Sequence, residues 1–350
     1  MACVDTLAVS GRSRRPGRGR ASNAVRFLPG LSALVCIAVV GSSGAAEASG
    51  QSATAHAATA PEQFTQLQQM SDALNRLEYE GTLVYLHDDH LAALRITHRV
   101  DNGVSQESLL ALNGPIRAVA RTERGVTCVL PDAHPILVER KGVTSKLLRS
   151  FDGALGHLDE HYLVHPLGSS RVAGRDSSVI GIIPRDRLRY GYRFYLDQAT
   201  SLPLKIDLMD GAARPIEQVM FTDIAVLGES PAPVDVESRS GEAEPVTPPA
   251  GWLLRQMPAG FDLVMYDQEV GSDPVSPMHH LLLSDGLASV SIYIEGNESG
   301  GLDGSAQMGA ANAVGARIDG HQVTVVGEVP PATVEAVLHG VRSATSTAHH

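Results

Sequence analysis

Apolar residues follow two periodicities along this chain, one helical and one strand-like. Just after Pro61, apolar residues recur every three or four positions, at Phe64, Leu67, Met70, Leu74 and Leu77. This spacing places them on one face of a helix, and the first turn of a helix tolerates a proline. We predict a helix that begins at Pro61 and packs on a core or, alternatively, lies across a sheet or the mouth of a cavity.

Beyond this helix, the dominant pattern is the alternation of period two that is typical of β-strands. Polar turns such as His87–His90 and Asp210-Gly211 separate the runs. The predicted strands are Thr82–Leu86, Leu91–Arg99, Ser108–Leu112, Ile116–Thr122, Val126–Leu130, Ile136–Arg140, Val179–Ile183, Tyr190–Leu196, Leu204–Met209 and Gln218–Ile224. Because regular helices do not separate them, they predict one large antiparallel sheet.

A sheet of this length tends to curl, and a curled sheet can enclose a ligand. In the strand Leu91–Arg99, the residues Leu94, Ile96 and His98 share one face because side chains alternate along a strand. We predict that Leu94 and Ile96, together with Leu67 and Met70 of the helix, line an apolar cavity.

Three histidines stand in a less regular part of the chain, 146–165, for which we consider a helix. His157, His161 and His165 are spaced by four residues, which would place them on one helical face, where neighbouring imidazoles can chelate zinc. The simpler interpretation is a solvated polar segment whose leucines pack instead. We adopt the simpler interpretation and predict no metal site.

A change in composition follows the predicted sheet. Residues 229–249 are rich in Pro, Glu and Ser and lack an apolar period, which is typical of a linker. We therefore predict a β domain at 61–228, this linker, and a second domain at 250–345.

The second domain is predicted to be a small α+β unit. A hairpin is expected around Asp285-Gly286, a strand at His321–Gly327, and a helix at Ala332–Val341 after two prolines. Residues 297–315 are rich in Gly and Ala and predict a mobile loop. The fold class expected for the whole chain is therefore mainly β with an α+β part.

The N-terminus has the composition of a secretory signal peptide. Arginines precede a short apolar run at Leu28–Val40, and small residues with possible cleavage sites near Ala46 and Ala48 follow it. The run is too short to favour a membrane-spanning anchor. We predict a signal peptide at 1–46 and a disordered leader at 47–60.

The charge of the chain excludes some partners. The formal net charge is −11, and loss of six Arg and one Asp with the signal peptide lowers it to about −16. Such an acidic chain is a poor candidate for binding nucleic acid or an anionic membrane. Cys128 would remain as a lone cysteine, so an intrachain disulfide is impossible, and we expect a buried, inert thiol.

No motif of catalysis or nucleotide binding is present. The chain lacks G-x-S-x-G, H-E-x-x-H, a P-loop and paired C-x-x-C. We therefore predict a protein that is not an enzyme and holds no cofactor or metal. Two basic segments, Val138–Lys141 and Arg185–Arg189, are interpreted as solvated turn charges or, alternatively, as contacts to a phosphate or an acidic peptide.

Four collinear blocks resemble the RseB/MucB family, the periplasmic negative regulators of the envelope-stress sigma factor. The blocks are 79–121, beginning YEGTLVYLHDDH, 171–210, beginning RVAGRDSSVIGI, 251–261, GWLLRQMPAGF, and 321–341, HQVTVVGEVPPATVEAVLHGV. Together they span most of residues 62–342.

The resemblance implies an N-terminal domain like the lipoprotein carriers LolA and LolB, a half-open β-barrel with a helical cap. It also implies a C-terminal domain that contacts the periplasmic part of an RseA/MucA-like anti-sigma factor. In such proteins, binding shields the anti-sigma factor from site-1 proteolysis. Ligands such as lipopolysaccharide or lipoprotein acyl chains relieve the shielding. The implied location is the periplasm, and a homo-oligomer is left open.

Large rings on a small domain are frequent anchors of interfaces. We therefore predict partner contacts at Trp252, Phe261 and Tyr293, with burial in the domain's own core as an equal alternative. The main alternative function is a periplasmic lipid or lipoprotein carrier without a signalling role, and the second domain argues against it. A periplasmic hydrolase is disfavoured because no catalytic constellation is present.

Overall fold

The computed structural model describes ten segments of the chain. They are residues 60–88, 90–101, 104–114, 118–122, 125–129, 136–138, 158–230, 246–269, 278–296 and 301–344. The predicted signal peptide, nearly all of the predicted leader and most of the predicted linker lie outside these residues. Among the described residues, no helix is long and apolar enough to cross a membrane.

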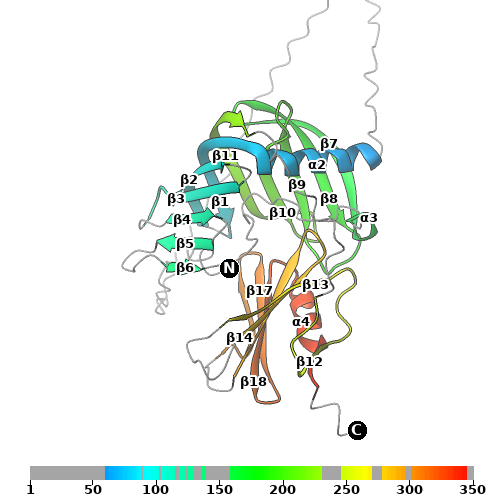
Figure 1. Ribbon diagram of the computed structural model, residues 1–350. Coiled ribbons are helices and arrows are strands. Elements are labelled where there is room, and N and C mark those ends of the chain that lie inside the picture. The colour runs from blue at the N-terminus through cyan, green and yellow to red at the C-terminus, as the bar shows by residue number, and fades with distance from the viewer. Residues whose placement is uncertain are drawn as a thin grey trace, which may run out of the picture. The chain divides into compact units, whose positions relative to one another are not determined.

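An antiparallel sheet of eleven strands forms the larger part of the fold (Figure 1). Its strand order is β6-β5-β4-β3-β2-β1-β11-β10-β9-β8-β7. The strands are β1 (Leu77–His87), β2 (His90–Asp101), β3 (Val104–Ala111), β4 (Ala118–Thr122), β5 (Gly125–Val129), β6 (Ile136–Val138), β7 (Tyr162–Val172), β8 (Arg175–Pro184), β9 (Gly191–Asp197), β10 (Pro203–Met209) and β11 (Pro215–Glu229). Two local meanders therefore make up this large sheet, and they join where β1 pairs with β11.

Helix α2 (Ala60–Arg76) packs its apolar stripe on the large sheet. Leu67 and Met70 have no exposed surface and Leu74 is also buried, whereas Leu77, which was predicted to belong to the stripe, is the buried first residue of β1. Figure 1 shows this blue helix lying across the strands of the large sheet. The helix predicted after Pro61 is confirmed, and its stripe belongs to the core of this sheet.

The predicted hairpin at His87–His90 is confirmed by the pairing of β1 with β2. On β2, the side chains of Leu94, Ile96 and His98 are all buried, as the alternation predicts. The imidazole of His98 stacks on the ring of Tyr79, with centroids 4.9 Å apart, and its Nδ1 lies 2.8 Å from the Leu77 carbonyl oxygen. Burial and the nearby Glu107 carboxylate raise the pKa of the Tyr79 phenol.

A second, six-stranded antiparallel sheet has the order β13-β14-β15-β18-β17-β16. Its strands are β13 (Asp262–Glu269), β14 (Met278–Ser284), β15 (Ser289–Glu295), β16 (Gly304–Met308), β17 (Ala311–Ile318) and β18 (His321–Gly327). Helix α4 (Pro331–Gly340) packs on it, beside the short paired strands β12 (Trp252–Leu254) and β19 (Val341–Ser343). We call the elements from β12 to β19 the small domain.

The strand signals of the small domain came from alternating β-branched residues. Val290 and Ile292 of β15 and Val323 and Val325 of β18 have no exposed surface and pack together in one core. The predicted hairpin around Asp285-Gly286, the strand at 321–327 and the helix at 332–341 are present. The predicted fold class, mainly β with a smaller α+β part, is confirmed.

Two parts of the sequence fold differently from the predictions. In the segment considered as a helix, only α3 (Leu158–His161) is helical among the described residues, and β7 begins at Tyr162. The segment predicted as a mobile loop contains β16 and the first part of β17. Its small residues have a packing role, because a side chain at Gly315 would collide with the backbone of Leu302.

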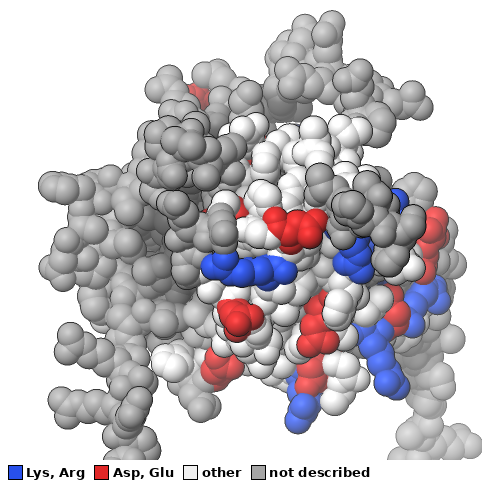
Figure 2. Space-filling view, turned by 90° about the horizontal axis from the view of Figure 1, so that it is seen from below, with Lys and Arg blue, Asp and Glu red and all other residues white. Residues whose placement is uncertain are grey.

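Charged side chains of both signs are mixed on the face seen in Figure 2. Blue Lys and Arg residues alternate there with red Asp and Glu residues, and the described residues of this face form no continuous basic surface. Charges of both signs are therefore interspersed on this face, and neither sign dominates it.

Candidate functional site

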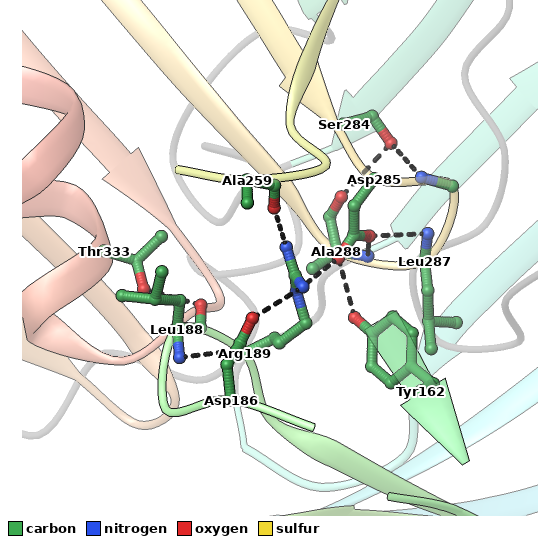
Figure 3. Close-up of polar contacts among 11 residues, drawn as sticks. Tyr162, Asp186, Leu188, Arg189, Ala259, Ser284, Asp285, Leu287, Ala288 and Thr333 are labelled. Atoms are coloured by element: carbon green, nitrogen blue, oxygen red, sulfur yellow. Dashed lines mark hydrogen bonds and ion pairs between the residues drawn. The ribbon is translucent and has the colours of Figure 1, made fainter. Parts of the chain in front are cut away.

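A buried ion pair connects the large sheet with the small domain (Figure 3). Arg189 lies in the loop between β8 and β9. Its Nε is 2.9 Å from Asp285 Oδ2, in an ion-pair contact that lacks the alignment of a hydrogen bond. Its Nη1 donates to Asp186 Oδ2 at 2.8 Å, and its Nη2 donates to the Ala259 carbonyl. The guanidinium therefore bridges a loop of the large sheet and two loops of the small domain.

Asp285 occupies the turn of the β14–β15 hairpin, where an Asp-Gly pair favours a tight reversal. Its Oδ1 accepts hydrogen bonds from the backbone N–H groups of Leu287, at 2.9 Å, and Ala288, at 2.6 Å. Its Oδ2 accepts the Tyr162 hydroxyl at 2.8 Å, in addition to contacting Arg189. The carboxylate therefore has four partners, and two of them belong to the large sheet.

The pair lies in a dry environment. Neither the Arg189 nor the Asp285 side chain has exposed surface. The guanidinium lies over two rings, with its Cζ 5.6 Å from the centroid of Tyr162 and 5.0 Å from that of Phe261. Burial and the Asp285 carboxylate raise the pKa of the Tyr162 phenol, which stays protonated and donates. If the pair separated while still buried, each charge would lack both its partner and hydration, which is strongly unfavourable.

Apolar side chains of the small domain accompany the ion pair. Leu287, next to Asp285, and Ala310, in the turn between β16 and β17, are both buried within the core of the large sheet. Two hairpin turns of the small domain thus complete the core beneath the large sheet. We call the contacts of these two turns with the large sheet the junction.

The second turn has its own polar contacts. The Ala310 N–H donates to Glu217 Oε1 at 2.8 Å, and the Tyr85 hydroxyl donates to Glu217 Oε2 at 3.0 Å. The Gly309 N–H donates to Asp88 Oδ2 at 3.1 Å. Outside the junction, the Thr333 hydroxyl at the start of α4 donates to the Leu188 carbonyl at 2.6 Å. Carboxylates of the large sheet therefore hold the backbone of this turn.

The predicted cavity residues come together in the structure. Leu67, Met70, Leu94 and Ile96 all belong to the core of the large sheet, and each is almost fully buried. This core also contains Tyr162 and the junction side chains. A role of the four residues in lining a ligand cavity stays a prediction.

The predicted partner residues lie in different environments. Trp252 and Phe261 are buried in the core of the small domain, which matches the alternative considered for them. Phe261 additionally faces Arg189. Tyr293 is half-buried on β15 and stacks on His280, with centroids 4.5 Å apart. Partner binding by these three residues stays a prediction.

The histidine set does not form a helical face. His161 ends α3 and His165 lies on β7, while His157 is outside the described residues. Within the described segments, no group of three or more His, Cys, Asp or Glu residues is arranged to hold a metal ion. Cys128 lies on β5, and its side chain is outside the described part.

Sequence reasoning did not find the pairing of Arg189 with Asp285. Arg189 was interpreted as part of a basic segment on a turn, and Asp285 as part of an Asp-Gly turn. Both are on turns, but Arg189 is buried and its partner is far away in the sequence. The available signal was that Arg189, unlike the other arginines of the basic segment, stands between Leu188 and Tyr190 just before β9, and it does not identify a partner.

Comparisons with known proteins agree with this architecture of a large sheet and an attached small domain. The family model of the MucB/RseB N-terminal domain matches residues 62–242, and that of the MucB/RseB C-terminal domain matches residues 246–342. The chain therefore belongs to the MucB/RseB family. The resemblance found in the sequence is confirmed.

Relatives and solved structures match over nearly their full lengths. The sigma factor AlgU regulatory protein MucB of Pseudomonas aeruginosa is 32% identical over 302 residues, which is 79% of this chain and 92% of that protein. The sigma-E factor regulatory protein RseB of Escherichia coli is 25% identical over 297 residues, 83% of this chain and 93% of that protein. The structure of the Pseudomonas aeruginosa MucA/MucB complex matches with a TM-score of 0.61 and 29% identity, and covers 81% of this chain and 99% of that one.

Proposed function

We propose that this protein is a periplasmic regulator that binds the periplasmic region of a membrane-anchored anti-sigma factor. Binding shields the anti-sigma factor from site-1 proteolysis and thereby restrains the envelope-stress sigma factor. Lipid-type ligands, such as lipopolysaccharide, release the protein from its partner. In this role it is a binding protein, not an enzyme.

The observation that carries the proposal is the match of both family domains, in order, to this chain. Relatives that match over most of their length are named as sigma-factor regulatory proteins. One solved relative is described as MucB in complex with MucA(peri), and it is 30% identical and covers 80% of this chain with a TM-score of 0.59. The predicted signal peptide supports export to the periplasm.

The proposed release by lipid follows from linkage between two binding equilibria. A ligand that prefers the unbound conformation weakens the affinity for the partner by the ratio of its affinities for the two states. Apolar ligands suit the core of a curled sheet, and the core residues Leu67, Met70, Leu94 and Ile96 are the proposed contacts.

The test is a titration of the mature chain, from residue 47, against the periplasmic segment of the host's anti-sigma factor. We expect tight binding, weaker binding in the presence of lipopolysaccharide, and slower cleavage of the segment by the site-1 protease. Lipid uptake without any binding of the segment would contradict the proposal and assign the protein to the carriers. The attached small domain favours the regulator, since a carrier needs only the large sheet.

A further inference from the structure

We propose that the junction is a latch, in which the Arg189–Asp285 pair makes docking of the small domain depend on the state of the large-sheet core. A lipid that enters this core undocks the small domain. The identity of the ligand rests on the proposed function, whereas the latch itself follows from the contacts between the two parts.

The first argument is that the latch and the core share side chains. Tyr162 belongs to the core of the large sheet, and its hydroxyl donates to Asp285. Leu287 belongs to the same core, and its backbone N–H donates to Asp285. An acyl chain that takes up volume in this core must displace side chains, because protein interiors are close-packed. Displacement of Tyr162 or Leu287 removes partners from the Asp285 carboxylate.

The second argument is that the ion pair responds in an all-or-none manner. Both side chains are without exposed surface, so neither charge can be hydrated while the junction is closed. A buried charge that loses its partner is strongly destabilising. Arg189 and Asp285 therefore either remain paired in a closed junction or separate completely into water. A modest displacement of side chains in the core of the large sheet therefore opens the junction completely.

The third argument is that the second turn opens in the same step. Ala310 is buried in the same core, and its N–H, like that of Gly309, donates to a carboxylate of the large sheet. Undocking exposes both of these N–H groups to solvent. Amide hydrogen exchange at residues 309 and 310 therefore reports the state of the latch without any substitution.

The first experiment measures amide hydrogen exchange of the mature protein with and without saturating deep-rough lipopolysaccharide. We expect exchange at Gly309 and Ala310 to become at least tenfold faster with the lipid. The Ser201 amide, which donates within a turn of the large sheet, serves as the control and should not change. Unchanged exchange at 309 and 310 would overturn the latch.

The second experiment closes the latch covalently. A Cβ built at Gly309 lies 3.7 Å from the Cβ of His87 on β1, within the usual range for a disulfide, about 3.5–4.5 Å. The variant is His87→Cys/Gly309→Cys with Cys128→Ser to remove the remaining thiol. Oxidised, it should bind the anti-sigma segment but resist release by lipopolysaccharide, and reduction should restore release. Release from the oxidised protein equal to that from the reduced protein would overturn the latch.

The two experiments separate failure of the latch from failure of the proposed function. Faster exchange at 309 and 310 with no effect of the lipid on the partner would support the latch and contradict the proposed regulation. Release of the partner by the lipid with unchanged exchange at 309 and 310 would contradict the latch and support the proposed regulation. If the disulfide variant does not fold, Asp285→Asn provides a second test, since it should speed exchange at 309 and 310 without lipid.

Discussion

Two Arg–Asp pairs in this protein have similar chemistry but different positions. Arg175 and Asp197 pair at 2.7 Å within the large sheet, and the Arg175 side chain is 31% exposed. Arg189 and Asp285 pair at 2.9 Å between the large sheet and the small domain, without exposure. The first pair secures a local turn, where Thr200 also donates to Asp197, whereas the second holds together segments that are far apart in the sequence.

The difference teaches that position determines what an ion pair controls. The local pair can open while its strands stay hydrogen-bonded to their neighbours, since β8 pairs with β9 along most of its length. The buried pair cannot open unless two parts of the chain separate. Loss of the Arg175–Asp197 pair should therefore lower the free energy of unfolding without changing the cooperativity of unfolding. Loss of the Arg189–Asp285 pair should change both.

The largest expected effect is that of Asp285→Ala. It leaves the Arg189 guanidinium buried without its carboxylate, and breaking such a pair costs about 3–5 kcal/mol. We expect the fluorescence of Trp252, the sole tryptophan, to report unfolding of the small domain at lower urea than circular dichroism reports for the whole chain. Coincident transitions would contradict a coupling role. Arg189→Met combined with Asp285→Ala should cost less than the sum of the single substitutions.

An intermediate effect is expected for Leu287→Ala, which removes an apolar contact of the junction and keeps its charges. Leu287 is 6% exposed and lies in the large-sheet core, so the free energy of unfolding should fall by about 2–3 kcal/mol. The matched control is Leu227→Ala on β11, where the side chain is 50% exposed and the change should stay within about 0.5 kcal/mol. Urea denaturation measures both, and equal losses would contradict the placement of Leu287.

The smallest effect is expected for Asp197→Asn, at about 1–2 kcal/mol. Burial alone would raise the pKa of Asp197, but hydrogen bonds from Arg175 and Thr200 outweigh it, and the pKa is lowered. A lowered carboxyl pKa stabilises the folded state above the unfolded value of about 3.9 and loses this contribution as pH falls through the folded pKa.

The difference in unfolding free energy between wild type and Asp197→Asn should therefore be full at neutral pH and shrink below about pH 4. Urea denaturation at several pH values measures it, with both optical probes remaining coincident at neutral pH. A difference that grows in acid would show that the pKa shift has the opposite sign.

Much of the fold could be predicted because many elements have one clearly apolar face and one clearly polar face. The stripe that contains Leu67 and Met70 and the alternation of Leu94, Ile96 and His98 correctly identified buried faces. Strand β7 was missed because a bulge between Pro166 and Gly168 interrupts its alternation. Strand β16 was missed because its small and polar residues do not alternate between an apolar and a polar face.

The junction could not be predicted because no local rule relates its members. Arg189 and Asp285 each occupy a turn, where charged residues are usually solvated. Only the tertiary arrangement buries them and brings Tyr162 and Phe261 around them. Membership of the family was predictable, by contrast, because it rests on long collinear blocks rather than on contacts across the fold.

The pairing of β1 with β11 has a consequence for how the protein acquires its structure. Every other neighbour in the large sheet is adjacent in the chain, whereas β1 must wait for the last strand of the sheet. Pairing between distant segments is slow because closing a long loop precedes the contacts that stabilise it. We therefore expect two meanders to form early in folding, and their union along β1 and β11 to limit the rate at which the large sheet is completed.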